Sequence, residues 1–351
     1  MSEEDLEPLS PKDGVEMYLD AKRDELTEST LTGQKYRLAA FTDWCEEEGI
    51  DNLNDLTGRD LYAYRVWRRE GKGDGRDPVK PVTLRGQLAT VRAFLRFAGD
   101  VEAVPKDLFD RVPLPTIDGD GDVSDSTLAP DRVKEILDYL GRYHYASRDH
   151  VTVLLGWRTG ARVGGLRALD LDDVDLDGDH EAVSGPAVHF VHRPDKGTPL
   201  KNKEAGTRWN RIGEYVAEVL RDYIEGPRDE VTDEHDREPL LTTIHGRPVR
   251  STLRESLYRV TRPCWRNEEC PHDTTPQECN ATEIEHASKC PSSRSPHDLR
   301  SGRVTYYRRE DVPRRVVKDR LNASEDILDK HYDRRSARER SEQRSEHLPD
   351  L

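Results

Sequence analysis

Apolar residues recur at helical spacing through the first third of the chain. Over residues 84–97 four of them stand at i, i+4, i+7 and i+11, on one face of a helix: Leu84, Leu88, Val91 and Leu95. An earlier set has similar spacing and ends near Gly49: Leu38, Phe41 and Cys45. A glycine-rich segment at 71–75 marks a loop between the two helices. Residues 14–115 are therefore expected to form a helical domain, with Cys45 in its core.

A second domain is predicted after a segment rich in Pro, Gly, Asp and Ser. Its pattern is helical from residue 128, strand-like around 188–191, and helical again after 296. The expected fold is mainly α with a small β-sheet or hairpin (α+β). We expect an acidic tail at 1–13, the helical domain at 14–115 and a linker at 116–127. The second domain should span 128–340, followed by a polar tail at 341–351.

The chain of 351 residues is strongly charged, with 36% charged residues and a net charge of −15. It contains no apolar run near the 18 residues that a spanning helix needs, and its acidic N-terminus is unlike a secretory signal. A cytoplasmic location without a membrane partner is expected. Arginine outnumbers lysine and aspartate is abundant. This composition resembles that of haloarchaeal proteins, so a halophilic protein is expected.

Positive charge is concentrated in two stretches of this acidic chain. Residues 59–96 carry 10 basic and 4 acidic side chains, net +6, and residues 294–340 carry 14 basic and 9 acidic, net +5. A basic stripe follows the helix at 84–97, at i, i+7 and i+11: Arg85, Arg92 and Arg96. Such stripes favour binding to DNA phosphates, and the alternative is a solvated helix face.

Five side chains in the second domain together suit cleavage of a phosphodiester: Arg162, Lys201, His297, Arg300 and Tyr332. Arginine forks bind phosphate oxygens, a tyrosine can form a covalent phosphoryl intermediate, and lysine and histidine can move protons. Ser295 and Pro296 are typical of a helix start. His297 and Arg300 then lie on one face of its first turn, where the helix N-terminus favours phosphate.

These residues resemble the tyrosine recombinase (phage integrase) family. Thr159-Gly160-Ala161-Arg162 is similar to the first box of that family, and Pro296-His297-Asp298-Leu299-Arg300 to the second. Leu321-Asn322-Ala323-Ser324, with Tyr332 eleven residues after Leu321, is similar to the third. The resemblance covers the whole second domain, and the helical domain before it fits the core-binding domain of the family.

The resemblance implies a role for each residue. Arg162 and Arg300 would bind the scissile phosphate, and His297 would assist proton transfer. Tyr332 would attack to give a 3′-phosphotyrosine, and Lys201 would protonate the leaving 5′-oxygen from a hairpin between residues 188 and 212. The hairpin offers two alternative lysines, Lys196 and Lys203.

Two positions depart from the family pattern. Ala323 stands where the family usually has a histidine or tryptophan that binds phosphate, and Gly165 stands where it usually has an acidic residue. His331 and Lys330 are the candidates for the missing donor. Neighbouring residues on a helix point about 100° apart, so His331 cannot simply replace it.

Cysteine and histidine are concentrated within 27 residues: Cys264, Cys270, Cys279 and Cys290, with His272 and His286 between them. In a reducing cytoplasm this clustering favours a structural zinc site over disulfides. The four cysteines are the preferred ligands and the two histidines are alternates. Free thiols and a disulfide remain open alternatives. The tyrosine chemistry itself needs no cofactor.

The sequence therefore predicts a DNA-breaking and rejoining enzyme, a site-specific recombinase acting on double-stranded DNA. The resemblance also implies a homotetramer on two DNA sites. One alternative is an enzyme like type IB topoisomerases, which would relax DNA of any sequence. Another is a zinc-stabilised DNA-binding regulator without catalysis, which the missing donor at Ala323 leaves open.

Overall fold

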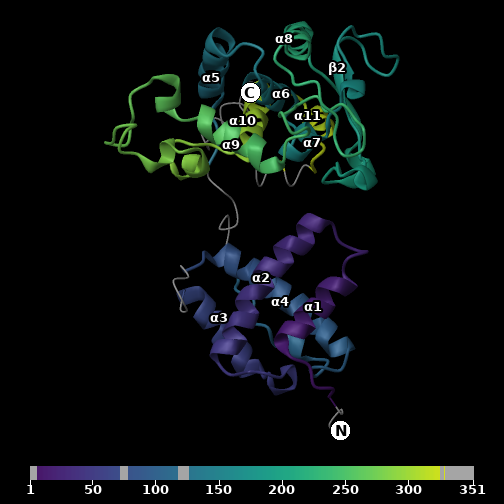
Figure 1. Cartoon of the computed structure of the whole chain (residues 1–351), viewed down its shortest axis with the longest axis vertical. Coiled ribbons are helices and arrows are strands. Elements are labelled where there is room, and N and C mark those ends of the chain that lie inside the picture. The colour runs from purple at the N-terminus through teal and green to yellow at the C-terminus, as the bar shows by residue number, and fades with distance from the viewer. Residues whose placement is uncertain (1–5, 72–77, 118–125, 325–327, 329–351) are drawn as a thin grey trace, which may run out of the picture. The chain divides into compact units, whose positions relative to one another are not determined.

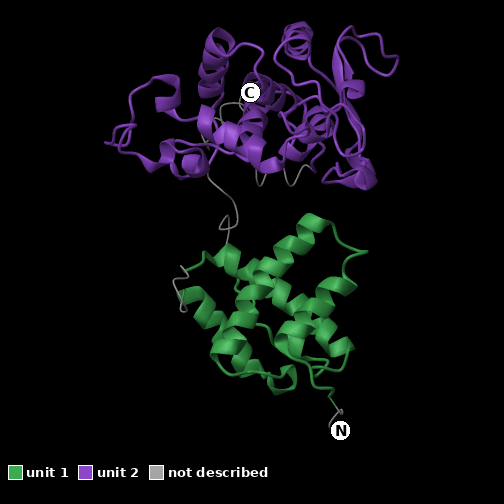
Figure 2. Cartoon of the chain, viewed as in Figure 1, with its two compact units in different colours: residues 1–123 green, residues 124–351 purple. Residues whose placement is uncertain are grey.

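The computed structural model describes residues 6–71, 78–117, 126–324 and 328. The chain divides into two compact units, residues 1–123 and 124–351 (Figure 2). The boundary falls within the segment 116–127 that the sequence marks as a linker. Within the described residues, no helix is both long enough and apolar enough to cross a membrane.

The first unit is built from helices α1 (Pro11–Ala21), α2 (Glu28–Glu47), α3 (Gly58–Glu70) and α4 (Pro81–Asp100), with short 3-10 turns η1 (Leu53–Asp55) and η2 (Leu108–Arg111) (Figure 1). The four apolar residues that predicted a helix over 84–97 are all buried on α4. They pack into a core that also holds an aromatic cluster: Tyr18, Phe41, Trp44, Tyr64 and Phe94. Cys45 is buried in this core, as expected.

The helices of the second unit are α5 (Pro130–Tyr143), α6 (Arg148–Thr159), α7 (Val163–Ala168), α8 (Glu214–Glu225), α9 (Arg250–Val260), α10 (Pro296–Arg309) and α11 (Arg314–Leu321). A three-stranded antiparallel sheet has the order β1 (Val174–Asp175), β2 (Ala187–Phe190) and β3 (Arg208–Arg211). The predicted mainly helical fold with a small sheet is confirmed. The β2–β3 connection carries Lys201 and contains two turns, η4 (Pro194–Lys196) and η5 (Lys203–Gly206).

Helix α10 lies in the middle of the second unit (Figure 1). Two glycines permit its close packing. A Cβ on Gly156 of α6 would lie 2.9 Å from Leu299 Cδ2, and a Cβ on Gly302 would collide with the backbone oxygen of Leu128. The backbone N of Leu128 in turn donates to the carbonyl oxygen of Asp298 at 3.1 Å. The start of the second unit therefore helps to hold α10.

Candidate active site

Helix α10 begins with a complete capping box. Ser295 Oγ accepts a hydrogen bond from the backbone N of Asp298 at 3.3 Å, and Asp298 Oδ2 accepts one from the backbone N of Ser295 at 2.7 Å. With Pro296 at the first position, the helix start predicted from the sequence is confirmed. His297 is exposed in the first turn, whereas Arg300 is only 1% exposed.

Arg300 joins the three sequence boxes. Its Nη1 donates to the carbonyl oxygen of Gly160 at 2.6 Å, and its Nη2 donates to that of Leu321 at 2.9 Å. These partners lie 140 and 21 residues away in sequence. Because both ends of the guanidinium are held, its orientation is fixed before any substrate arrives, as electrostatic stabilisation of a charged transition state requires.

The close approach of the first and third boxes depends on Gly160. This residue ends α6 with φ +63°, a left-handed conformation that glycine adopts without strain. A Cβ at this position would collide with the Leu321 side chain, 2.1 Å from Cδ2. The glycine therefore brings its own carbonyl oxygen, and Arg162 two residues later, next to the end of α11.

Three successive carbonyl groups at the end of α11 each accept a hydrogen bond from a different arginine. Arg320 O accepts from Arg208 Nε at 2.9 Å and Asn322 O accepts from Arg162 Nη1 at 3.3 Å, on either side of the bond from Arg300 to Leu321 O. The last carbonyls of a helix lack partners within the helix and carry partial negative charge. They hold the three guanidinium groups together without neutralising them.

A small pocket lies beside this cluster. Its lining includes Arg162, Lys201, Arg208, Asn202 and Asn322. Asn202 Nδ2 donates to the carbonyl oxygen of Asn322 at 3.1 Å, which ties the β2–β3 connection to the end of α11. The pocket therefore brings together two of the predicted residues, Arg162 and Lys201.

The alternative lysines of the β2–β3 connection are placed differently. Neither Lys196 nor Lys203 lines this pocket. The carbonyl oxygen of Lys196 accepts a hydrogen bond from Arg237 Nη2, so Arg237 holds the turn η4 that carries Lys196. Lys203 has a left-handed backbone, with φ 52°. Of the three hairpin lysines, Lys201 is the one that shares a pocket with Arg162.

Arg208 is a pocket residue that the sequence analysis did not single out. Burial, together with repulsion from Arg300, Arg162 and Arg320, lowers its pKa to about 9. Its position at the start of β3, seven residues after Lys201 on the same hairpin, was the available signal. Burial is the larger cause of the lowered pKa, and the repulsion shows that positive side chains are concentrated here, which would favour an anion in the pocket.

The remaining catalytic candidates are Tyr332, His331 and Lys330, which lie outside the described residues. At the two positions that depart from the family pattern, Ala323 is buried and Gly165 lines the pocket. A Cβ on Gly165 would make ordinary contact with the Phe190 ring at 3.4 Å.

No family model matches the chain. A tyrosine recombinase XerC of Roseiflexus sp. (strain RS-1) is 28% identical over 168 residues, which cover 47% of this chain and 51% of that protein. A tyrosine recombinase XerD of Bifidobacterium longum (strain NCC 2705) is 24% identical over 246 residues, 68% of this chain and 70% of that protein. The chain is thus similar to curated tyrosine recombinases, in agreement with the resemblance seen in its sequence.

A solved structure of a Tn1549 transposon integrase with circular intermediate DNA shares the fold. It has a TM-score of 0.64 and 13% identity, and the match covers 97% of this chain and all of that one. The chain spans about half the length of the first of these curated relatives and about two thirds of the second. The fold expected for a tyrosine recombinase is confirmed by this likeness.

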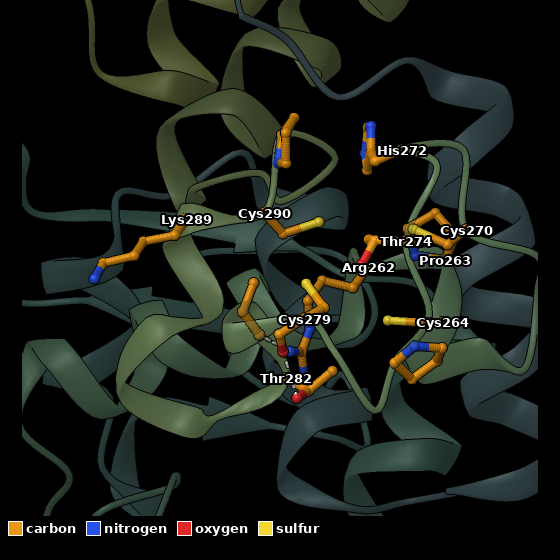
Figure 3. Close-up of a pocket in the computed structure, with 13 residues that line it drawn as sticks. Arg262, Pro263, Cys264, Cys270, His272, Thr274, Cys279, Thr282, Lys289 and Cys290 are labelled. Carbon is orange, nitrogen blue, oxygen red and sulfur yellow. Dashed lines mark hydrogen bonds between the residues drawn. The ribbon is translucent and has the colours of Figure 1, made fainter.

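The cysteine-rich segment of the chain lies between α9 and α10. The segment has only short 3-10 turns: η6 (Pro263–Arg266), η7 (Asn280–Thr282) and η8 (Ile284–Lys289). All four cysteines and His272 line one pocket, into which the labelled thiols of Cys264, Cys270, Cys279 and Cys290 converge (Figure 3). His286 lies outside the pocket lining and its Nδ1 is 3.1 Å from Glu283 Oε2.

The cysteine pocket does not have ligand geometry as it stands. In the described part of the chain, no three His, Cys, Asp or Glu side chains are arranged closely enough to hold a metal ion. The five thiols are free, and burial raises the pKa of Cys264. His272 Nε2 forms a hydrogen bond with Ser292 Oγ at 2.8 Å. The predicted ligands therefore line one pocket, but their side chains are not close enough together to bind a metal ion.

The three arginines expected to bind DNA all lie on α4 of the first unit. Arg92 Nη2 is 2.5 Å from Asp110 Oδ1, and Arg96 stacks over the Phe109 ring at 4.4 Å. Both partners belong to η2, so these two arginines also stabilise the first unit. Arg85 is exposed and has no ion pair among the described residues.

Proposed function

We propose that the protein is a site-specific DNA recombinase that cleaves and rejoins double-stranded DNA through a 3′-phosphotyrosine. The observation that supports this most directly is the Arg300 guanidinium, held between Gly160 and Leu321 beside the pocket of Arg162 and Lys201. Positively charged side chains that are fixed in place can stabilise a phosphodiester during cleavage, because its negative charge grows as phosphorus becomes pentacoordinate.

In the proposed reaction the Tyr332 hydroxyl oxygen attacks phosphorus and forms a new O–P bond. The bond between phosphorus and the 5′-oxygen breaks, and Lys201 Nζ gives its proton to that oxygen. His297 assists removal of the tyrosine proton, and Arg162 and Arg300 bind the non-bridging oxygens. A 5′-hydroxyl then attacks the phosphorus of the phosphotyrosine and forms a new phosphodiester. The bond between phosphorus and the Tyr332 oxygen breaks, and the tyrosine regains its proton.

This reaction needs no ATP, because one phosphodiester is exchanged for another of similar energy. It also needs no catalytic cofactor, since side chains supply the nucleophile and the proton transfers. We propose that exchange takes place in a homotetramer on two DNA sites, with Arg85, Arg92 and Arg96 on α4 contributing to DNA binding.

Covalent capture tests the proposal. A duplex selected by wild-type binding from a random-sequence pool would be nicked near the site and incubated with protein in concentrated potassium salt. On a denaturing gel, wild type should give a protein–DNA adduct and Tyr332→Phe should give none. Binding without an adduct in the wild type would contradict the proposal and favour a DNA-binding regulator. Relaxation of supercoils without site preference would favour a topoisomerase.

We further propose that Cys264, Cys270, Cys279 and Cys290 bind a structural zinc ion, with His272 as an alternate. The four thiols line one pocket, and the segment that carries them has only short 3-10 helices of its own. A tetrahedral set of soft ligands would supply the stability that such a segment lacks. The segment leads directly into Ser295, the cap of α10, so its order bears on the active site.

Metal analysis of the purified full-length chain tests the zinc proposal. We expect about one zinc per chain for the wild type and a large loss for Cys279→Ser. The matched control is Cys45→Ser, because Cys45 is buried in the core of the other unit. Wild-type protein that takes up no zinc when reduced and supplied with the metal would overturn this proposal and leave the recombinase proposal intact.

A further inference from the structure

Arg208 is fixed by contacts on three sides. It is the first residue of β3 and pairs with Phe190 of β2, and its guanidinium stacks over that ring at 4.6 Å. Nε donates to the carbonyl oxygen of Arg320 at 2.9 Å, and Nη1 donates to that of Gly206 at 2.8 Å. Within the described residues, Nη2 makes no hydrogen bond and is not among the fully buried polar atoms. One N–H edge of a rigid guanidinium is therefore open where Arg208 lines the pocket.

The contrast with other arginines of the same unit indicates that Arg208 is not simply structural. Arg247 is nearly fully buried, and its Nη2 lies 2.9 Å from Asp233 Oδ2 and also contacts Asp170. Among the described residues, neither Arg208 nor Arg162 has a carboxylate within ion-pair distance. A clustered arginine without a carboxylate leaves positive charge that a bound anion can balance.

Arg208 is also held in the same way as the two predicted phosphate ligands. The carbonyl groups of Arg320, Leu321 and Asn322 accept from Arg208, Arg300 and Arg162 in turn. Arg208 and Arg162 line the same pocket. The arrangement is that of one cluster of three arginines, in which the third member comes from the sheet.

We infer that Arg208 is a third phosphate-binding arginine, which donates from Nη2 to a non-bridging oxygen of the scissile phosphate. This inference rests on the proposed recombinase activity. Arg208 would supply a donor in a chain where Ala323 can supply none from its side chain. Its charge matters as the phosphorus becomes pentacoordinate, so its removal should slow cleavage more than it weakens DNA binding.

The test compares Arg208→Gln with wild type on two nicked duplexes of the selected sequence. One carries the ordinary phosphodiester and the other a methylphosphonate, in which a methyl group replaces one non-bridging oxygen and makes the centre neutral. On the phosphodiester we expect Arg208→Gln to lower the cleavage rate by about 100-fold, as for loss of one preorganised donor. On the neutral centre the two proteins should differ by less than about fivefold, because its transition state carries one negative charge fewer and offers one non-bridging oxygen fewer to bind.

Two variants sharpen the result. Arg208→Lys keeps the charge but loses the planar fork, so its rate should lie between those of wild type and Arg208→Gln. Arg211→Gln is the matched control, because Arg211 is exposed on the opposite face of β3, and it should cleave both duplexes like wild type.

Each remaining outcome decides against the inference. An equal loss for Arg208→Gln on both duplexes would assign Arg208 a structural role through its bond to Arg320. A rate within about threefold of wild type on the phosphodiester would show that the donor is not used. Absence of any adduct with the wild type would instead contradict the proposed function itself, so the two failures are distinguishable.

Discussion

Arg300 and Leu321 are joined by a hydrogen bond of 2.9 Å from Nη2 to the backbone oxygen. The bond links the second sequence box to Leu321, which is the last residue of α11 and the first residue of the third box. Together with the bond from Nη1 to Gly160, it lets one buried side chain link α6, α10 and α11. Arg300 therefore supports the fold as well as the proposed chemistry.

Arg300→Lys should separate these two contributions. Lysine keeps the charge but cannot donate to Gly160 and Leu321 at once in a planar fork, so we expect cleavage to fall by at least about 100-fold. The free energy of unfolding should also fall, by about 1–3 kcal/mol, because at least one of the two buried carbonyl groups loses its charged donor. Denaturant unfolding and the adduct assay measure the two effects. Arg315→Lys, at an exposed position of α11, should unfold like wild type.

Gly160→Ala should destabilise the second unit. An alanine at φ +63° is strained, and its Cβ would lie 2.1 Å from Leu321 Cδ2, so we expect a loss of about 2–3 kcal/mol in unfolding free energy. Gly33→Ala is the matched control, because Gly33 lies inside α2 with nothing within 4 Å of the added Cβ. That variant should be as stable as wild type or more stable, by up to about 1 kcal/mol. Equal thermal shifts in the two variants would contradict the close approach of the two boxes.

His150 should make the protein less stable in mild acid. Burial lowers its pKa to about 4, and its Nδ1 accepts a hydrogen bond from the backbone N of Ala146 at 3.2 Å. Below the unfolded pKa of about 6.5, the His150 imidazole binds a proton in the unfolded chain but not in the folded chain. The stabilisation is complete above that pH and is lost toward pH 4, at up to about 1.4 kcal/mol per pH unit.

Denaturant unfolding of wild type and His150→Gln between pH 4 and 8 measures this contribution. The variant should have a shallower dependence of unfolding free energy on pH below 6.5, whatever its stability at pH 8. Asp233, whose pKa is lowered to about 2 by hydrogen bonds and by Arg247, loses its contribution only at lower pH and so does not interfere. Parallel curves for the two proteins would show that His150 does not titrate in this window.

The sequence predicted what depends on local pattern. The apolar spacing on α4 and the Ser295-Pro296 helix start are local features, and both are confirmed. The role of Arg208 depends on β3 pairing with β2 and on the end of α11, more than 100 residues later. No sequence pattern shows that contact. Likewise, spacing indicated the basic stripe that includes Arg92 and Arg96, but it could not show that Asp110 contacts Arg92 and that Phe109 lies under Arg96.

Salt dependence of DNA binding should distinguish the arginines of α4. Each phosphate contact releases counterions, so a plot of log affinity against log salt loses about 0.9 from its slope for every contact removed. Arg85 is exposed without an ion pair in the described chain, so Arg85→Gln should show this full change with little effect on unfolding.

Arg92→Gln should behave differently from Arg85→Gln. Because Arg92 already pairs with Asp110, its removal should change the slope less and lower the unfolding free energy by up to about 1 kcal/mol. Fluorescence anisotropy with the selected duplex over a range of potassium concentrations measures both slopes. An unchanged slope in Arg85→Gln would mean that this face of α4 does not contact the DNA backbone, and that the basic stripe serves the fold of the first unit alone.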